Sequence, residues 1–244
     1  MDATQFLNGK TVLVTGASGG IGSQLVKAFI AAGAAHVLAA GRTPVAQDGR
    51  VHFLPLDLSS DASVEAAAAQ AGAQVDVIVN NSGFNANQRL ADCSTADAAN
   101  EMDVNYFGLL RMYRCFAPAM KQRGSGTFVN ILTVLARANL PTMATYCASK
   151  AAALSLTQAM RAELSPHGVR VCAVLPAAVD TRMSAHAPQP KLAPAELAEA
   201  VLGALRDGTE DVYPGAAANL HKLLQADWKA VERMLAGRLP KAQT

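Results

Sequence analysis

Two side chains that could exchange a proton stand four residues apart, Tyr146 and Lys150 in the run Tyr-Cys-Ala-Ser-Lys. In a helix, residues at this spacing lie on the same face, one turn apart. A free tyrosine has a pKa of about 10, too high for efficient proton exchange with an alcohol at neutral pH. A nearby ammonium group favours the phenolate and lowers that pKa. The pair is thus a candidate general acid and base, although the same spacing is common on ordinary helix surfaces.

A glycine-rich turn supplies a second candidate chemistry, the binding of a phosphate. Gly16, Gly19, Gly20 and Gly22 follow a short apolar run and lead into a helical pattern. The N–H groups and the dipole at a helix N-terminus favour an anion, and glycines let the backbone approach it closely. The turn predicts a site for a nucleotide pyrophosphate, and a merely tight strand-to-helix connection is the plain alternative.

The elements that must position these groups alternate along the chain. Short Val/Ile/Leu runs are separated by longer Ala-rich helical stretches, which is typical of a parallel sheet covered by helices on both faces. We expect strands at Thr11–Thr15, Ala35–Ala40, Val51–Leu56, Val75–Asn80, Gly126–Leu132, Val169–Leu175 and Asp211–Tyr213. We expect helices at Ile21–Ala32, Ala62–Ala71, Thr95–Gln122, Ala144–Leu164 and Pro194–Arg206. The fold class predicted is α/β, a Rossmann-like doubly wound parallel sheet.

No repeat or low-complexity linker divides this series, so residues 1–244 are expected to form a single domain. The Pro-rich stretch 185–194 is expected to be a loop near the substrate, and residues 215–244 a helical tail. Within the tail, the stretch His221–Arg238 has five apolar residues at helical spacing. They are Leu223, Leu224, Trp228, Val231 and Leu235. We predict a terminal helix that packs on the domain or on a neighbouring subunit.

The charge, apolar stretches and cysteines of the chain indicate which classes of partner are not expected. A net charge of +2 without a long Lys/Arg run favours neither nucleic acid nor an anionic membrane as a partner. The longest apolar stretch, residues 28–41, is shorter than the roughly 20 residues of a membrane span, and the N-terminus lacks the features of a secretory signal. The four cysteines form no CxxC pair, so no metal site is expected. We expect a cytoplasmic protein.

Further motifs follow the glycine turn in a fixed order. Asp57 follows the third expected strand, and the run Asn-Asn-Ser-Gly at 80–83 follows the fourth. Asn105 lies in the long helix, and Thr133 stands 13 residues before Tyr146. With the Gly-x-x-x-Gly-x-Gly spacing of the turn, this order resembles the short-chain dehydrogenase/reductase family, of the classical type, over about residues 9–182. The family usually has alanine in place of Ser82 and serine in place of Thr133.

The resemblance implies hydride transfer between a nicotinamide and a carbonyl carbon, with Tyr146 as general acid or base. It also implies that Lys150 lowers the Tyr146 pKa, that Thr133 orients the substrate oxygen, and that Asn105 helps to hold a water that leads protons to the lysine. The cofactor contacts implied are Gly16, Ser18, Gly20, Ile21, Gly22, Arg42, Asp57, Asn81, Tyr146, Lys150, Val179 and Thr181. Thr181 ends a Pro-Ala-x-x-x-Thr segment in which Ala177 replaces the glycine of the family.

The end of the second expected strand bears on the choice of cofactor. NAD-selective enzymes place a carboxylate there for the ribose 2′-hydroxyl, whereas this chain has Gly41 followed by Arg42. A guanidinium offers charge-assisted hydrogen bonds to a 2′-phosphate, so NADP is favoured over NAD. Arg42 could alternatively be a solvated surface arginine, or stack on the adenine without selecting a phosphate.

The substrate pocket implied by the resemblance is apolar. Thr133, Leu135, Met143 and Met183 would line it, with Asn139 and His186 as possible polar contacts, which suits a hydrophobic ketone, aldehyde or secondary alcohol. The alternative is a nucleotide-binding regulatory or scaffolding protein that has lost turnover. A sugar-nucleotide epimerase is disfavoured because the chain leaves no room for a substantial substrate domain. The family commonly assembles through its long helices, so a homo-oligomer, a tetramer or dimer, is expected.

Overall fold

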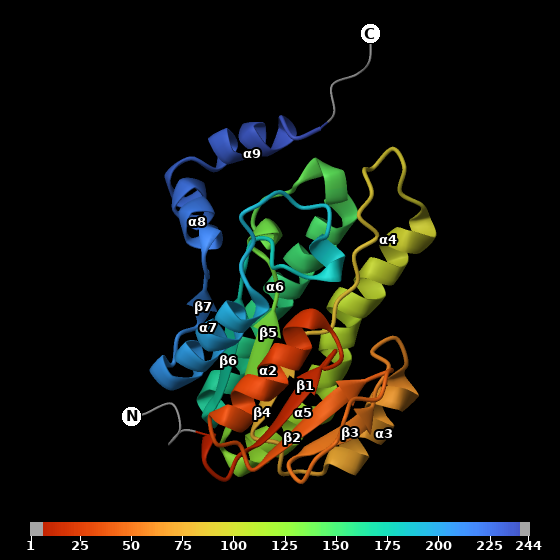
Figure 1. Cartoon of the computed structure of the whole chain (residues 1–244), viewed down its shortest axis with the longest axis vertical. Coiled ribbons are helices and arrows are strands. Elements are labelled where there is room, and N and C mark those ends of the chain that lie inside the picture. Colours follow the sequence, from red (N-terminus) through yellow and green to blue (C-terminus); the bar gives the residue numbers. More distant parts are fainter. Residues whose placement is uncertain (1–6, 240–244) are drawn as a thin grey trace.

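One parallel sheet organises the fold. The computed structural model describes residues 7–239, and its sheet has seven strands in the order β3-β2-β1-β4-β5-β6-β7. Every neighbouring pair is parallel (Figure 1). The strands are β1 (Thr11–Thr15), β2 (His36–Gly41), β3 (Val51–Pro55), β4 (Val77–Asn80), β5 (Gly126–Ile131), β6 (Val169–Val174) and β7 (Asp211–Val212). The doubly wound α/β fold expected from the sequence is confirmed.

Helices cover both faces of this sheet. On one face the core joins α3 (Asp61–Ala71), α5 (Gly108–Arg123) and α6 (Ala144–Leu164) to the strands, and on the other it joins α2 (Gly20–Ala31) and α7 (Pro194–Asp207). Successive residues of β1 point to opposite faces, yet Val12, Leu13 and Val14 are all fully buried. This double burial explains why the strands read as continuous apolar runs.

The long helix expected at Thr95–Gln122 is interrupted. It consists of α4 (Thr95–Met102), a π-helical turn at Asp103–Phe107, and α5. Gly108 comes directly after the turn and packs against the loop between β3 and α3. A Cβ on Gly108 would lie only 2.9 Å from Cβ of Leu58 in that loop. Such π turns are rare and often mark functional sites. The turn carries Asn105, one of the residues implicated by the sequence.

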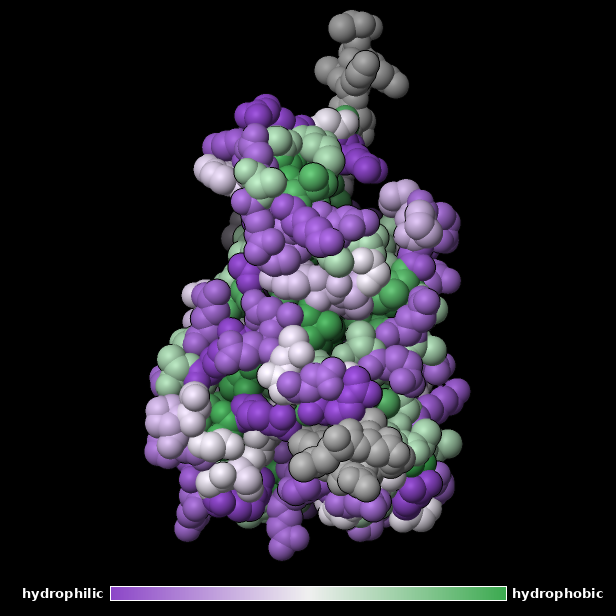
Figure 2. Space-filling view, turned by 90° about the vertical axis from the view of Figure 1, so that its left-hand side faces the viewer, coloured by the Kyte–Doolittle hydropathy of each residue, from purple (hydrophilic) through white to green (hydrophobic). Residues whose placement is uncertain are grey.

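The single packed helix predicted for the tail is wrong. The tail forms α8 (Ala216–Ala226) and α9 (Trp228–Ala236), separated by Asp227 in an extended conformation. The Asp227 carboxylate accepts the N–H of Ala230 at 2.9 Å, so this residue caps a new helix instead of continuing the first. Trp228 is 60% exposed and does not pack on the domain, whereas Val231 and Leu235 are buried. Figure 2 shows hydrophobic side chains among hydrophilic ones in this upper part of the molecule.

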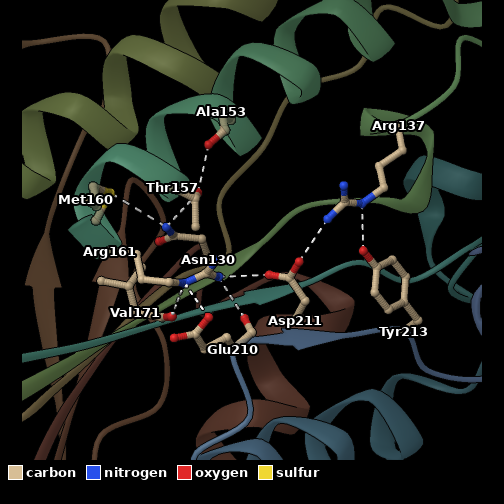
Figure 3. Close-up of polar contacts among 10 residues, drawn as sticks. All are labelled: Asn130, Arg137, Ala153, Thr157, Met160, Arg161, Val171, Glu210, Asp211 and Tyr213. Atoms are coloured by element: carbon tan, nitrogen blue, oxygen red, sulfur yellow. Dashed lines mark hydrogen bonds and ion pairs between the residues drawn. The ribbon is translucent and has the colours of Figure 1, made fainter. Parts of the chain in front are cut away.

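A polar network fastens the start of the tail to the domain (Figure 3). Asp211 of β7 accepts from Arg161 of α6 and from Arg137, each at 2.8 Å. Arg137 also donates to the Tyr213 hydroxyl at 2.6 Å, and the Tyr213 ring stacks on His221 of α8 with a centroid distance of 3.8 Å. These side chains reinforce the backbone pairing of the two-residue strand β7 with β6. No helix within residues 7–239 is long and apolar enough to cross a membrane.

A buried amide joins three elements in the middle of the sheet. Asn130 of β5 is fully buried, and its Oδ1 accepts from Asn80 of β4 at 2.8 Å. Its Nδ2 donates to Thr157 of α6 at 3.0 Å (Figure 3). Both partners are buried, so neither has water as a substitute. This side chain thus contributes a buried polar link between β4, β5 and α6.

Asn130→Ala is expected to lower the free energy of unfolding by about 2 to 3 kcal/mol, because buried donors and acceptors lose their partners. Urea unfolding followed by circular dichroism measures the change. Asn219→Ala, on the exposed side of α8, is the control and should change it by less than about 0.5 kcal/mol. A loss of similar size in both variants would contradict the role of Asn130.

Candidate active site

Tyr146 and Lys150 lie in the first turns of α6, beside the carboxyl end of β5. Lys150 is 5% exposed, and its ammonium donates to the carbonyl of Ile131, the last residue of β5, at 3.2 Å. Its Nζ is 5.9 Å from the centre of the Tyr146 ring. Burial lowers the pKa of Lys150 to about 8. The structure therefore brings the two residues together at the sheet edge, as their spacing predicts.

The Tyr146 phenol has a raised pKa. Burial is the largest cause, and the charges of Cys147 and Glu101 add to it. The lowering of this pKa that the resemblance implied for Lys150 is not found in the chain by itself. The physical reason is that desolvation disfavours the phenolate, while the ammonium directs its hydrogen bond to Ile131 rather than to the phenol. Tyr146 therefore holds its proton firmly.

Thr133 lies at the end of β5 and is 6% exposed. Its hydroxyl donates to the carbonyl of Pro176 and accepts from the N–H of Leu135, each at 3.2 Å. A hydroxyl has one proton and two lone pairs, so one lone pair is left. To donate to a substrate oxygen, Thr133 has to release Pro176. The residue is placed as the sequence predicts, with its donor already engaged.

Asn105 connects the strand β4 to the helix α6. Its Oδ1 accepts from the N–H of Phe84 at 2.9 Å, and its Nδ2 donates to the Phe84 carbonyl at 2.8 Å and to Ser149 at 2.9 Å. A Cβ on Gly83 would lie 3.2 Å from Asn105 Oδ1 and 3.4 Å from Lys150 Nζ. Asn105 thus stands close to the lysine. The water that it is expected to hold there stays a prediction.

The glycine turn is folded so tightly that a side chain would not fit at Gly16 or Gly22. Gly16 has φ +65°, and a Cβ on Gly22 would lie only 2.1 Å from the Gly16 carbonyl oxygen. Asn81 fixes the turn, because its Nδ2 donates to the Thr15 carbonyl at 2.9 Å and its N–H to the Thr15 hydroxyl at 3.0 Å. The Asn81 side chain is therefore engaged with the protein, and its expected contact with a cofactor stays a prediction.

The start of α2 fits a pyrophosphate. The residue that precedes the helix, Gly19, has no side chain to cap it, and the first turn carries no acidic residue. Its N–H groups are thus available to an anion, beside Ser18 and Ile21. The methyl of Thr181 faces Gly20 from the other side, at 3.1 Å from the position of a Cβ there. Glycines in this turn leave room that a dinucleotide backbone would need.

The segment after β6 closes over the turn without backbone strain. Among the described residues other than glycine, only Asn87 has a positive φ, so the alanine at 177 adopts an ordinary conformation. Val179 is buried and forms a bridge with Leu192, which lies within the predicted loop. The same segment brings Thr181 against Gly20 of the glycine turn.

Arg42 and Asp57 lie near each other at the carboxyl ends of β2 and β3. Hydrogen bonds from Ser59 Oγ at 2.7 Å and Ser59 N–H at 3.0 Å lower the pKa of Asp57, and the nearby Arg42 lowers it further. Arg42 is exposed and forms no hydrogen bond within residues 7–239. Its guanidinium is free to bind a ligand at this corner.

The expected substrate residues are spread around Tyr146. Leu135 and Met143 are half-buried, whereas Met183 is 48% exposed on a short 3₁₀ turn. Asn139 is exposed and donates to the Ala144 carbonyl at 3.0 Å, and His186 is exposed in the predicted loop. No group of three His, Cys, Asp or Glu residues within 7–239 could hold a metal ion.

Two residues near the site were missed by the sequence reasoning. Glu101 of α4 is 1% exposed, and Asn85 follows β4 with its Nδ2 3.8 Å from Met143 Sδ. The position of Glu101, one helical turn before Asn105, is the signal that could have identified it. Asn85 has no comparable signal, because a loop asparagine is ordinarily a turn residue.

Comparison with known proteins decides the family. Residues 10–191 match the family described as short chain dehydrogenase. The chain belongs to this family. Ketoacyl reductase HetN from Nostoc sp. is 33% identical over 230 residues, which cover 84% of this chain and 78% of that protein. This short-chain dehydrogenase is therefore an oxidoreductase.

Solved structures of other short-chain dehydrogenases have the same fold. One from Burkholderia cenocepacia in complex with NADP is 41% identical, with a TM-score of 0.90, and the match covers 96% of this chain and 99% of that one. A 3-ketoacyl-(acyl-carrier-protein) reductase from Brucella melitensis complexed with NADH is 28% identical, with a TM-score of 0.77. That match covers 86% of this chain and 99% of the reductase. Both nicotinamide cofactors thus occur among similar proteins.

Gly22→Ala is expected to weaken the binding of NADPH at least about tenfold, because a methyl 2.1 Å from the Gly16 carbonyl must displace the turn. Titration of NADPH fluorescence measures the dissociation constant. Gly49→Ala is the matched control, since its Cβ would meet nothing within 4 Å and NADPH should bind to it normally. Unchanged binding in Gly22→Ala would exclude the turn as the pyrophosphate site.

Proposed function

We propose that this short-chain dehydrogenase is an NADP(H)-dependent reductase of ketones or aldehydes, with Tyr146 as the general acid or base. The observation that carries the proposal is the convergence of Tyr146, Lys150, Thr133 and Asn105 at the edge of the sheet that also carries the open N-terminus of α2. Two similar proteins bear the names of ketoacyl reductases, which favours a carbonyl substrate.

The residues of the chain divide the work of binding. The N–H groups of the glycine turn would hold the pyrophosphate, Val179 and Thr181 the nicotinamide, and Lys150 its ribose. When bound, the cofactor supplies the hydride for reduction or accepts it for oxidation. Leu135 and Met143 would form an apolar wall that keeps water from the reacting carbonyl.

The proton chemistry belongs to Tyr146. A phenol with a raised pKa stays protonated at neutral pH, so it is ready to donate to a carbonyl oxygen as negative charge develops there. Thr133 would orient the same oxygen after exchanging its hydrogen bond with Pro176. Lys150 would attract the developing phenolate, with Asn105 beside it.

Tyr146→Phe removes the proton donor and keeps the ring, so kcat for ketone reduction should fall by about 10²-fold or more. The oxidation of NADPH at 340 nm measures it, with a panel of alkyl and aryl ketones. Tyr106→Phe is the control, because the Tyr106 hydroxyl has no hydrogen bond among the described residues and its removal should leave kcat unchanged. Equal kcat values for Tyr146→Phe and the wild type would reject the assignment.

The cofactor preference rests on Arg42. Its exposed guanidinium next to Gly41 suits a 2′-phosphate, and no carboxylate stands at Gly41 to bind the 2′-hydroxyl of NAD. The similar structure from Burkholderia cenocepacia is a complex with NADP, which supports this choice. The complex of the Brucella protein with NADH makes NAD the alternative.

Arg42→Ala should lower kcat/KM for NADPH about tenfold or more, the scale of one charge-assisted phosphate contact, and change kcat/KM for NADH by less than about twofold. Initial rates with both cofactors measure the ratio. Arg114→Ala, an exposed arginine on α5, controls for net charge and should leave the ratio unchanged. A wild-type enzyme that prefers NADH would overturn the assignment.

A second function is favoured by one observation, the engaged hydroxyl of Thr133. A chain in which this donor never leaves Pro176 would bind the nucleotide and turn over poorly, as a regulatory or scaffolding protein. The same ketone panel distinguishes the two functions. NADPH binding without NADPH oxidation, for the wild type and Tyr146→Phe alike, would support the scaffolding function.

A further inference from the structure

Two side chains of one helix face hold the chain that follows β4. Asn105 binds both backbone groups of Phe84, and four residues earlier the Oε1 of Glu101 accepts the N–H of Ala86 at 2.8 Å. Residues 84–86 are held at both ends.

The burial of Glu101 calls for an explanation. The side chain is 1% exposed, and its Oε2 has no hydrogen-bond partner among the described residues. A buried carboxylate with one unsatisfied oxygen is costly for stability. The other carboxyl oxygen, Oε1, accepts the N–H of Ala86, the neighbour of Asn85. The effect of the Glu101 side chain is thus to fix the backbone beside Asn85.

Asn85 lies between the two held residues with a fixed side-chain orientation. Its Oδ1 accepts the N–H of Asn87 at 2.7 Å, and Asn87 has a φ of 55°. A backbone N–H can only donate, so the oxygen of the carboxamide faces Asn87 and the nitrogen faces away. The Nδ2 meets Met143 Sδ at 3.8 Å, and a thioether is a weak acceptor. The Nδ2 group of Asn85 can therefore still donate a hydrogen bond to a stronger acceptor, such as a carbonyl oxygen.

The position of this donor relates it to the reacting centre. Met143 directly precedes α6 and stands three residues before Tyr146. A substrate whose carbonyl reaches Tyr146 and whose chain passes Met143 would bring a second polar atom to Asn85. The neighbouring expected pocket residues Leu135 and Met143 are apolar. The amide of Asn139, also expected near the pocket, already donates to the Ala144 carbonyl at 3.0 Å, whereas the Asn85 amide meets only the thioether of Met143. A substrate acceptor that reaches this region would find its partner in Asn85.

We propose that Asn85 is a substrate-binding residue whose Nδ2 donates to a second acceptor oxygen of the substrate, and that Glu101 is the positioning residue that holds Asn85 in place. The inference rests on the proposed ketone reductase function and deepens it. The substrate class is a ketone that carries a further carbonyl or ester oxygen, in preference to a plain alkyl ketone.

Two ketones of equal chain length test the role of Asn85. Ethyl 3-oxobutanoate carries an ester group, and heptan-2-one replaces that group by methylenes. Asn85→Ala should raise KM for the keto ester about 3- to 10-fold, the scale of one hydrogen bond, and leave KM for heptan-2-one and the Kd of NADPH within about twofold. Asn87→Gly is the matched control, because it keeps both the backbone N–H and the positive φ and should leave both KM values unchanged.

The role of Glu101 is tested by rescue. Glu101→Gln keeps an acceptor for the Ala86 N–H and should keep the keto ester KM within about twofold, whereas Glu101→Leu removes the acceptor and should raise it as Asn85→Ala does. Both variants remove the Glu101 charge that contributes to the raised pKa of Tyr146, so they are compared with each other, and their kcat values with heptan-2-one should agree within about twofold. Circular dichroism and NADPH binding verify the fold, and Asn85→Ala decides alone if Glu101→Leu does not fold.

The outcomes separate this inference from the proposed function. If the wild type reduces both ketones and Asn85→Ala changes both KM values equally, or changes neither, the inference is overturned and the reductase function stands. Equal effects of Glu101→Leu on both ketones would overturn the positioning role. If the wild type reduces no ketone, the proposed function fails, and the inference fails with it.

Discussion

The backbone groups at the carboxyl ends of the parallel strands have to find partners outside the sheet, and the site depends on how they do so. Thr15 and Asn81 join the ends of β1 and β4 through hydrogen bonds of 2.9 and 3.0 Å. Asn105 pairs with Phe84 just beyond β4, and Lys150 with Ile131 at the end of β5. Thr15, Asn105 and Lys150 are buried, so the bonds that they make fix the chain segments beyond the strands.

Burial at this edge has opposite effects on the two titrating groups. It raises the pKa of Tyr146 and lowers that of Lys150 to about 8, because each charged form loses hydration. In the chain by itself, the phenol therefore keeps its proton and the ammonium turns to a backbone carbonyl. In the ketone reduction that we propose, such a phenol would supply the proton to the substrate oxygen.

The structure also explains where the sequence was read incorrectly. The tail was expected to be one helix because its apolar spacing is continuous, but Asp227 accepts an N–H of the next turn and starts α9 instead. The helix from Thr95 was expected to be regular, and the close approach of Gly108 to Leu58 accompanies the π turn that carries Asn105. The expected dimer or tetramer stays a prediction.

The sequence by itself predicted the strands of the sheet, the helices other than the π turn and the divided tail, and the glycine turn. It also named Tyr146, Lys150, Thr133 and Asn105 as candidate site residues. These features depend on local patterns of apolar residues and on motifs at fixed spacing. Only the tertiary structure decided that the Thr133 hydroxyl donates to the Pro176 carbonyl, and that the buried Glu101 side chain accepts the N–H of Ala86. Those partners are 43 and 15 residues away, and no local pattern encodes which buried groups will meet.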